Sequence, residues 1–277
     1  MRVVVYEPNY NDKHCEILRA FAAGIPDAVV RKATDFIPGD GDIGVVFGWY
    51  KNAYAPTMTK KPIIEHYRAR GRHRLIVIES GFQLRGEYYQ IGWDGFAGNA
   101  DFVSGGVDSC RWDAMPIRSK PWRDQKPGNT VVIGQLPRDT QVQDVDHARW
   151  CRETMAKCVD LFGFRNGRVL FRPHPRCNEP EIYGIDQYPM DTGKLEDTLK
   201  AAERVVTWNS TTGVDAILAG VPVVAMDRGA MVWSIASHSL EDPLVYPDRK
   251  QWFASLGYSQ WTLPEMRRGL PWQHLTR

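Results

Sequence analysis

Short runs of β-branched and apolar residues alternate along the chain with stretches in which apolar positions recur at helical spacing. The runs with strand character lie at 3–6, 43–47, 75–78, 131–133, 169–171, 205–207 and 223–225. The stretches with helical character lie at 12–23, 58–70, 143–162, 194–203 and 211–219. Because uninterrupted apolar strands separated by helices are typical of parallel sheets covered on both faces, the pattern predicts an α/β fold.

A cluster of prolines and charged residues between 116 and 129 interrupts this pattern and predicts a linker. The chain has 277 residues, 43% of them hydrophobic, which is enough for two cores. We therefore expect two Rossmann-like domains that face a cleft: 1–125, and 126–277 with capping helices at its C-terminal end. Ligands of such sheets bind beyond the carboxyl ends of the strands, so these ends are where chemistry is expected.

The strongest local signal follows the strand at 169–171, where Arg172 and Arg176 flank His174 between two prolines. Proline fixes φ and removes a backbone donor, so the imidazole is held in a restricted loop. Guanidinium and imidazole groups neutralise and hydrogen-bond phosphate oxygens. The alternative is a surface loop with incidental charge, but its place at a strand's carboxyl end favours an anion site.

A hydroxyl-rich turn follows the strand at 205–207 and opens the helix at 211–219, with Asn209 or Ser210 expected as the N-cap. Free amides and hydroxyls at such a turn bind phosphate without a lysine. Simple capping is the alternative reading. Asp215, one turn into the helix, is either a ligand of a ribose hydroxyl or a solvated helix acid.

Two acids follow strands in different halves of the chain. Glu79 follows 75–78 and Asp139 follows 131–133. A carboxylate facing the cleft from either domain can serve as general base, nucleophile or ligand of a sugar hydroxyl. Either acid by itself would be an ordinary loop residue.

Several common sites lack their sequence signatures. There is no G-x-G-x-x-G after the first strand, no Walker motif, no G-x-S-x-G and no H-E-x-x-H. Asp144, Asp146 and His147 share a helix start and predict capping, so no metal is expected. The five scattered cysteines contain no C-x-x-C pair and support neither a zinc site nor a disulfide framework.

Charge and hydropathy restrict the partners. The net charge is +2, yet residues 51–74 carry seven basic residues and one acid, Glu65. This local excess indicates either an anionic contact or a solvated helix face. No apolar run is long enough to span a bilayer and no signal peptide is evident, so we expect a cytoplasmic protein.

Four segments together resemble the motifs of capsule-type Kdo transferases. Residues 79–85 resemble E-D-G-F-x-R, and 135–140 are similar to Q-x-x-x-D-[ST]. Residues 172–175 resemble R-x-H-P, which is shared with bacterial sialyltransferases and glycerophosphotransferases, and 210–216 resemble S-x-T-G-x-E-A. Their order and spacing over 77–226 imply a glycosyltransferase of the GT-B type.

The resemblance implies a division of labour between the domains. The first domain would bind the acceptor and the second the nucleotide sugar, without any further cofactor. Asp139 would be the leading catalytic carboxylate and Glu79 a second acid near the acceptor. The donor, a UDP-sugar or alternatively a CMP-sugar, would be held by Arg172, His174, Gln135, Ser210, Thr211, Thr212 and Asp215.

Two departures from the family pattern matter. Ser80 replaces an aspartate, which bears on the acceptor chemistry, and Asp215 replaces a glutamate, which shortens the reach to a ribose.

The whole chain also resembles compact phage-encoded glycosyltransferases, some of which decorate hydroxymethylated pyrimidines in viral DNA. This likeness implies transfer to 5-hydroxymethylcytosine or 5-hydroxymethyluracil in DNA, in the host cytoplasm. The DNA would be bound by the basic residues Lys51, Lys60, Lys61, Arg68, Arg70, Arg72 and Arg85. The alternatives are a capsule or surface-glycan acceptor, and a non-enzymatic module that binds nucleotide or DNA.

Overall fold

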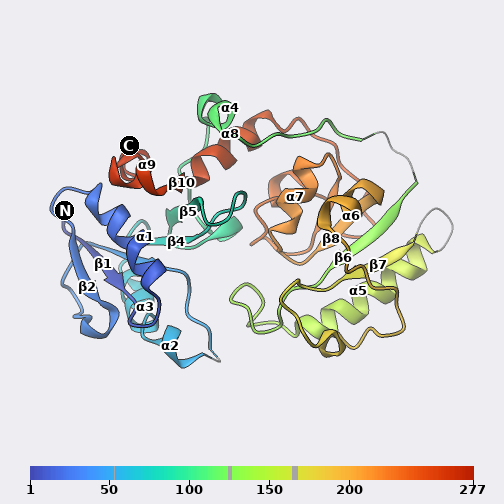
Figure 1. The fold of residues 1–277 in the computed structure, drawn as a ribbon, viewed down its shortest axis with the longest axis horizontal. Coiled ribbons are helices and arrows are strands. Elements are labelled where there is room, and N and C mark those ends of the chain that lie inside the picture. The colour runs from blue at the N-terminus through green and yellow to red at the C-terminus, as the bar shows by residue number, and fades with distance from the viewer. Residues whose placement is uncertain (53, 124–126, 164–167) are drawn as a thin grey trace. The chain divides into compact units, whose positions relative to one another are not determined.

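The computed structural model describes residues 1–52, 54–123, 127–163 and 168–277, and these form two compact units (Figure 1). Unit 1 combines Met1–Pro116 with Arg249–Arg277, and unit 2 is Ile117–Asp248. The predicted α/β class is confirmed in both. No helix among the described residues is both long and apolar enough to cross a bilayer.

Unit 1 is built on a six-stranded sheet in the order β10-β5-β4-β3-β1-β2. Its strands are β1 (Val3–Glu7), β2 (Val29–Lys32), β3 (Ile43–Phe47), β4 (Leu75–Ser80), β5 (Tyr88–Trp93) and β10 (Gln260–Thr262). Its helices are α1 (Asp12–Ala23), α2 (Ala55–Met58), α3 (Lys61–Ala69), α4 (Cys110–Ala114), α8 (Lys250–Ser259), α9 (Leu263–Arg267) and α10 (Leu270–Leu275). Short 3-10 turns lie at Ala33–Asp35 and Ala97–Asn99.

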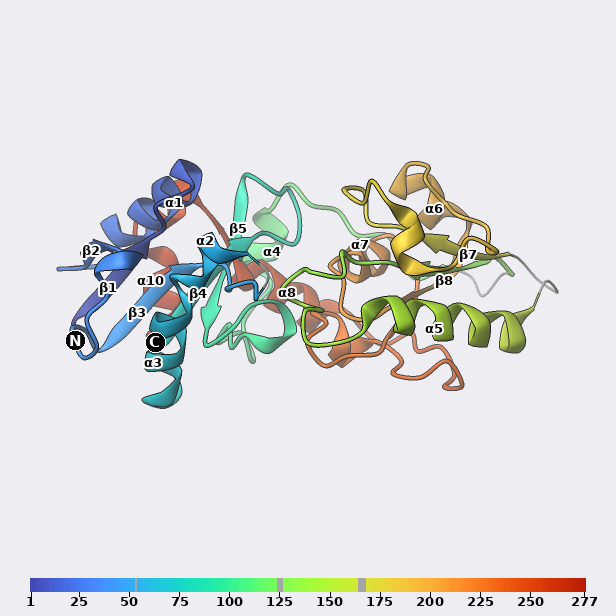
Figure 2. The same cartoon turned by 90° about the horizontal axis from the view of Figure 1, so that it is seen from below.

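Alternate strand residues of unit 1 enter two separate cores. On β1, Val3 and Val5 join the core beneath α1, whereas Val4 and Tyr6 join the core beneath α3. Figure 2 shows α1 and α3 on opposite faces of the sheet. Two-sided burial explains why these strands are continuous apolar runs.

Unit 1 differs from the expected parallel sheet along one side. β5 pairs antiparallel with β4, and β10 pairs antiparallel with β5. The sequence did not predict β2, β5 or β10. The helix expected at 58–70 is two helices, α2 and α3, with Pro62 in the first turn of the second.

The C-terminal segment also differs from expectation. We expected it to cap the second domain, whereas Arg249–Arg277 belongs to unit 1. The end of α1 packs so closely on α9 that a Cβ at Gly24 would lie 2.0 Å from the Met266 carbonyl oxygen. The division near residue 117 agrees with the proline cluster, but unit 1 is discontinuous in sequence.

Unit 2 has a four-stranded, fully parallel sheet, and parallel pairing was predicted. Its strand order is β7-β6-β8-β9. Its strands are β6 (Asn129–Ile133), β7 (Val169–Arg172), β8 (Ala202–Thr207) and β9 (Val223–Ala225). Its helices are α5 (His147–Phe162), α6 (Leu195–Ala201) and α7 (Thr212–Leu218), with 3-10 turns at Pro180–Tyr183 and Trp233–Ile235. Both views show α5 and α6 on opposite faces of the sheet (Figures 1 and 2).

A substitution of Met266, in α9, tests whether the C-terminal segment stabilises unit 1. Its side chain is fully buried in the unit 1 core under α1, so Met266→Ala is expected to destabilise unit 1 by about 2–5 kcal/mol. Hydrogen exchange should accelerate in β1, β3 and α1 and stay unchanged in β6–β9. Ile182→Ala, at an exposed position of unit 2, is the matched control. Faster exchange in unit 2 alone would show that the segment stabilises the other unit.

Candidate functional site

The predicted donor-binding residues of unit 2 lie on loops at one edge of its sheet. Because all four strands are parallel, their carboxyl ends share this edge (Figure 1). The loops begin at Gly134 after β6, Pro173 after β7, Trp208 after β8 and Met226 after β9. This is where ligands of open α/β sheets bind.

Asn209 joins three of these loops through its buried side chain. Its Oδ1 accepts a hydrogen bond from Gln135 Nε2 at 2.9 Å, and its backbone N–H donates to Gln135 Oε1 at 3.3 Å. Its Nδ2 donates to the Gln141 carbonyl oxygen at 3.0 Å and to Asp227 Oδ1 at 2.9 Å. The loops after β6, β8 and β9 are therefore held in a fixed relation.

Gln135 and Asn209 have different roles from those the sequence suggested. Gln135 is 5% exposed and its amide is paired with Asn209, so it fixes the loops and has little surface for a nucleotide. Asn209 does not cap α7, because its amide is committed to the neighbouring loops. Thr211 directly precedes the helix without a side-chain capping bond, whereas Ser210 Oγ accepts the backbone N–H of Thr212, the first residue of α7, at 3.2 Å.

His147 and Tyr183 hydrogen-bond to the backbone of the same loop at Gln135. The backbone N–H of Gln135 donates to His147 Nε2 at 2.9 Å, and Tyr183 Oη donates to the Gln135 carbonyl oxygen at 3.1 Å. The neutral His147 ring therefore carries its proton on Nδ1, which is buried and has no hydrogen-bond partner among the described residues. Burial lowers the pKa of His147 to about 4.

The loop after β7 separates the two residues of the predicted anion site. The Arg172 guanidinium pairs with the Asp191 carboxylate and donates to Thr198 Oγ1, both at 2.9 Å. His174 is half-buried, and its Nδ1 accepts the Arg176 backbone N–H at 3.1 Å. The neutral ring therefore carries its proton on Nε2, which suits donation to an anionic oxygen.

The hydroxyls after β8 form a compact turn. Ser210 Oγ accepts the Thr212 backbone N–H and lies 3.2 Å from Thr212 Oγ1, while Thr207 Oγ1 accepts the Ser210 backbone N–H. Ser210, Thr211 and Thr212 are all half-buried, as is Asp215 on α7. The structure thus brings the predicted hydroxyl residues together on the edge that also carries the His174 loop.

Asp139 lies in a tight turn after β6. Its backbone N–H donates to the Leu136 carbonyl oxygen at 2.8 Å, and its Oδ1 accepts the Thr140 backbone N–H at 3.0 Å. The side chain is half-buried. This turn belongs to the same edge as the Gln135–Asn209 pair, so Asp139 shares an edge with the predicted phosphate ligands.

Glu79 lies at the carboxyl end of β4 in unit 1, beside Gly48 at the end of β3. Its Oε1 accepts the Ser80 backbone N–H at 2.8 Å. A Cβ built on Gly48 would lie 2.9 Å from Glu79 Oε2 and 3.5 Å from Lys60 Nζ. The following loop is held by Gln260 Oε1, which accepts the Phe82 backbone N–H at 2.9 Å. That Glu79 and Asp139 face each other stays a prediction.

The seven basic residues expected to bind DNA do not share one environment. Lys60 is 3% exposed and donates to backbone carbonyl groups. Arg70 donates to the carbonyl oxygen of Gly41, before β3, and Arg72 pairs with Asp101. The others are Lys51, in the loop after β3; Arg85, in the turn after β4; and Lys61 and Arg68, which lie over the rings of Tyr50 and Trp49. Lys60, Arg70 and Arg72 are thus engaged within unit 1, and DNA binding by this set stays a prediction.

Sequence reasoning missed Asp227, which lies two residues after the end of β9 and accepts hydrogen bonds from Asn209 Nδ2 and the Gly229 backbone N–H, each at 2.9 Å. Its place after the run 223–225 was a usable signal. The burial of Lys60 and His147 gave no such signal, because single charged residues read as surface groups. Within the described ranges, no group of three or more His, Cys, Asp or Glu side chains is arranged to hold a metal ion.

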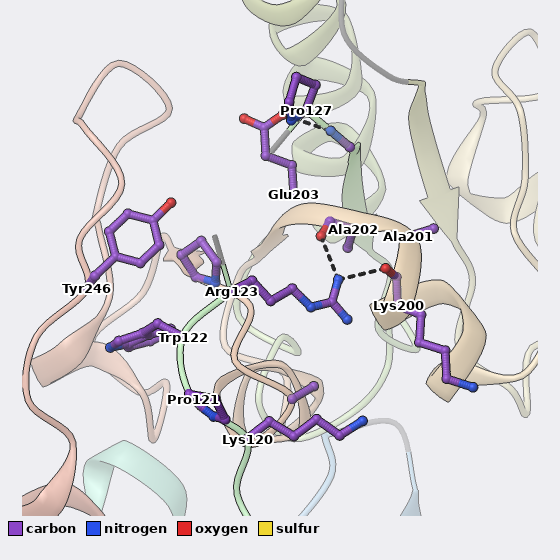
Figure 3. A pocket seen from close by; sticks show the side chains of 13 residues that line it. Lys120, Pro121, Trp122, Arg123, Pro127, Lys200, Ala201, Ala202, Glu203 and Tyr246 are labelled. Carbon is purple, nitrogen blue, oxygen red and sulfur yellow. Dashed lines mark hydrogen bonds between the residues drawn. The ribbon is translucent and has the colours of Figure 1, made fainter. Parts of the chain in front are cut away.

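A cavity of about 690 Å³ lies at the opposite, amino edge of the unit 2 sheet (Figure 3). Its lining includes Gly128 before β6, Ala202 at the start of β8 and Pro222 before β9. Arg123 fills its centre and donates to the carbonyl oxygens of Lys200 and Ala202 at 2.7 and 3.2 Å. None of the predicted site residues lines this cavity, so it is separate from the candidate site.

Two solved structures have a similar fold. One is Thermosulfurimonas dismutans KpsC, beta Kdo 2,4 transferase, with a TM-score of 0.56 and 14% identity over 92% of this chain and 89% of that chain. The other is Thermosulfurimonas dismutans KpsC, beta Kdo 2,7 transferase, with a TM-score of 0.53 and 13% identity over 99% of both chains. No family model and no curated protein matches the sequence. The likeness shows a Rossmann-like α/β fold of the GT-B type.

Asn209→Asp tests the link between the loops of unit 2. The substitution replaces the Nδ2 donor by an oxygen that faces Asp227 and the Gln141 carbonyl group. We expect a loss of about 2–4 kcal/mol in the free energy of unfolding, because acceptors would face each other in a buried site. Urea unfolding measures it, and Asn178→Asp adds the same charge at an exposed position of unit 2. Equal stability of the two variants would contradict the proposed role of Asn209.

The lowered pKa of His147 predicts that the folding stability of unit 2 decreases in acid. The unfolded chain takes up a proton at the ordinary pKa of 6.5, whereas the folded unit does so only near 4. This contribution to stability is complete above pH 6.5 and is lost as the pH falls towards 4, by roughly 2–3 kcal/mol.

Urea unfolding at pH 7 and pH 4.5, with hydrogen exchange read in 129–135, measures this loss. The loss should shrink in His147→Gln and persist in His238→Gln, a substitution of an exposed histidine in unit 2. The same pH dependence in both variants would assign the acid sensitivity to other groups.

Proposed function

We propose that this chain is a glycosyltransferase that moves a sugar from a nucleotide-sugar donor to a hydroxyl group of a capsule or surface glycan. The observation that carries the proposal is the likeness of the whole chain to two Kdo transferases in fold. It is supported by the gathering of His174, Asp139 and the Ser210 turn at the carboxyl edge of one parallel sheet.

The donor's phosphate is bound by the loops after β7 and β8. His174 Nε2–H donates to a phosphate oxygen, since Nδ1 is already an acceptor for the Arg176 N–H. The hydroxyls of Ser210 and Thr212, 3.2 Å apart, add neutral donors. Arg172 acts indirectly, because its pairing with Asp191 fixes the end of β7 from which the His174 loop departs.

Transfer requires a proton acceptor and stabilisation of the leaving group. The acceptor hydroxyl gives its proton to a carboxylate, its oxygen bonds to the anomeric carbon, and the bond from that carbon to the phosphate oxygen breaks. The leaving phosphate keeps the electron pair and is stabilised by His174 and the hydroxyl turn. Asp139 and Glu79 are the carboxylates proposed for this chemistry.

A glycan acceptor has more support than a DNA acceptor. Duplex DNA binding needs several cations in register along a backbone, whereas Lys60 is buried and Arg70 and Arg72 lie at the edge away from Glu79. Both acceptors offer a hydroxyl group, so a transfer assay can separate them directly.

Transfer is tested with CMP-Kdo, CMP-sialic acid and UDP-sugars, each offered with a fluorescent Kdo-terminated oligosaccharide or a hydroxymethylcytosine oligonucleotide. A mass gain of one sugar on the oligosaccharide is expected. His174→Ala and Asp139→Asn should lower kcat/KM at least about 100-fold, and Asp186→Asn, at an exposed position of unit 2, should not. A gain on the oligonucleotide alone would favour the DNA acceptor, and no gain with any donor would overturn the proposal.

A further inference from the structure

Lys60 is a buried lysine at the carboxyl edge of the unit 1 sheet. It is 3% exposed, and its Nζ donates to the carbonyl oxygens of Phe47 at 2.6 Å and Trp49 at 3.0 Å. These two groups flank Gly48, whose φ of +66° is a left-handed conformation that favours glycine. The ammonium group therefore bridges the turn that ends β3.

This turn lies against Glu79. A Cβ at Gly48 would lie 2.9 Å from Glu79 Oε2 and 3.5 Å from Lys60 Nζ, so the carboxylate takes up the space that a side chain would need. The carboxylate and the ammonium group thus both lie next to Gly48. Alternation along β4 agrees with this, since Leu75 and Val77 face the α3 side of the sheet.

We propose that Lys60 is a positioning residue of the acceptor site: it fixes the Gly48 turn and places its charge beside the Glu79 carboxylate, which keeps this carboxylate ionised as the proton acceptor. The proposal rests on the proposed function for its chemistry. The proton of the acceptor hydroxyl passes to Glu79, and the ammonium group stays protonated throughout.

The charges around Lys60 favour this role. Burial lowers the pKa of Lys60 to about 8; the Glu79 carboxylate opposes this shift and the charge of Lys51 adds to it. On the α1 side, the ring of His14 stacks on Phe47 at 3.9 Å, and burial, with the charges of Lys60 and Lys13, lowers the pKa of His14 to about 4. At neutral pH His14 is therefore uncharged, and Lys60 carries the positive charge next to Glu79.

If the role of Lys60 were confined to holding the turn, a buried lysine would be energetically unfavourable at this position. Burying an ammonium group costs stability that a neutral side chain of similar length would not cost. Lys60→Met removes this cost but leaves the Phe47 and Trp49 carbonyl groups without their donor. A role confined to stability would leave the titration of Glu79 unchanged, and this difference makes the proposal testable.

The deciding measurement is the titration of Glu79, which needs no substrate. The protein is labelled with ¹³C-carboxyl glutamate, and Glu79→Gln identifies the signal. In Lys60→Met the midpoint for Glu79 should rise by about one pH unit or more, because a cation within a few ångströms favours the ionised carboxylate. In Lys60→Arg, and in Lys61→Met at the neighbouring position, it should stay close to the wild-type value. An unchanged midpoint in Lys60→Met overturns the proposal.

The reciprocal measurement covers a Lys60→Met variant that does not fold. In ¹⁵N-lysine protein, Glu79→Gln should lower the midpoint of Lys60 below its value of about 8, since the two charges stabilise each other. An unchanged Lys60 midpoint would likewise contradict the coupling.

Kinetics connects the coupling to transfer. With the donor and acceptor found active above, the acidic limb of kcat/KM should move to higher pH in Lys60→Met. The decline expected above pH 8 in the wild type should be absent in Lys60→Arg, since arginine keeps its charge. Gly48→Ala should lower transfer at least tenfold, because its Cβ would displace the Glu79 carboxylate and the φ of +66° favours glycine. If no donor is transferred, the two titrations still decide the role of Lys60; if the titrations fail while wild-type transfer persists, only the role of Lys60 is lost.

Discussion

The hydrogen bonds of the Asn209 side chain fix the loops after β6, β8 and β9 of unit 2 relative to one another. A parallel sheet brings strand ends to one edge, but it does not fix the loops that leave them. The Asn209 amide does so because it donates towards Asp227 and Gln141 and accepts from Gln135 within one buried group. Asparagine combines donors and an acceptor without charge, which neither aspartate nor leucine provides. The phosphate-binding geometry proposed above depends on this rigidity, since electrostatic stabilisation needs groups that are already in place.

Unit 1 meets the same requirement with a charged group. Lys60, at the start of α3, bridges the carbonyl groups of the turn after β3. A buried ammonium group costs more than an amide, but it also imposes an electric potential on its surroundings. The two units therefore use buried polar side chains for loop ordering, and in unit 1 that ordering comes with a charge beside Glu79.

The sequence predicted the strands that are buried on both faces of a sheet. It did not predict the elements whose position depends on tertiary contacts. Runs such as 43–47 and 131–133 are apolar throughout because both faces are covered, and this pattern identifies buried strands. β5 was not predicted because its sequence, which contains two tyrosines and a glycine, shows no clear alternation of apolar and polar residues. Its antiparallel pairing also depends on the turn after β4. The assignment of Arg249–Arg277 failed because proximity in sequence does not report that β10 completes the sheet of unit 1. Lys60 was read as a surface charge, since its burial results from the turn around Gly48 and not from its own neighbours in sequence.

The segments that resemble family motifs lie at strand ends, and the structure shows which of their residues are committed to packing or to neighbouring loops. In 79–85, Gly81 is required by packing, because a Cβ there would lie 2.5 Å from the Tyr88 carbonyl oxygen, and Phe82 is buried. In 135–140 and 172–175, Gln135 and Arg172 are committed to neighbouring loops. Glu79, Asp139 and His174 each accept a backbone N–H of their own loop, and their carboxyl and imidazole groups can also take part in proton transfer. For this reason the proposed chemistry is assigned to these three residues and not to the motifs as wholes.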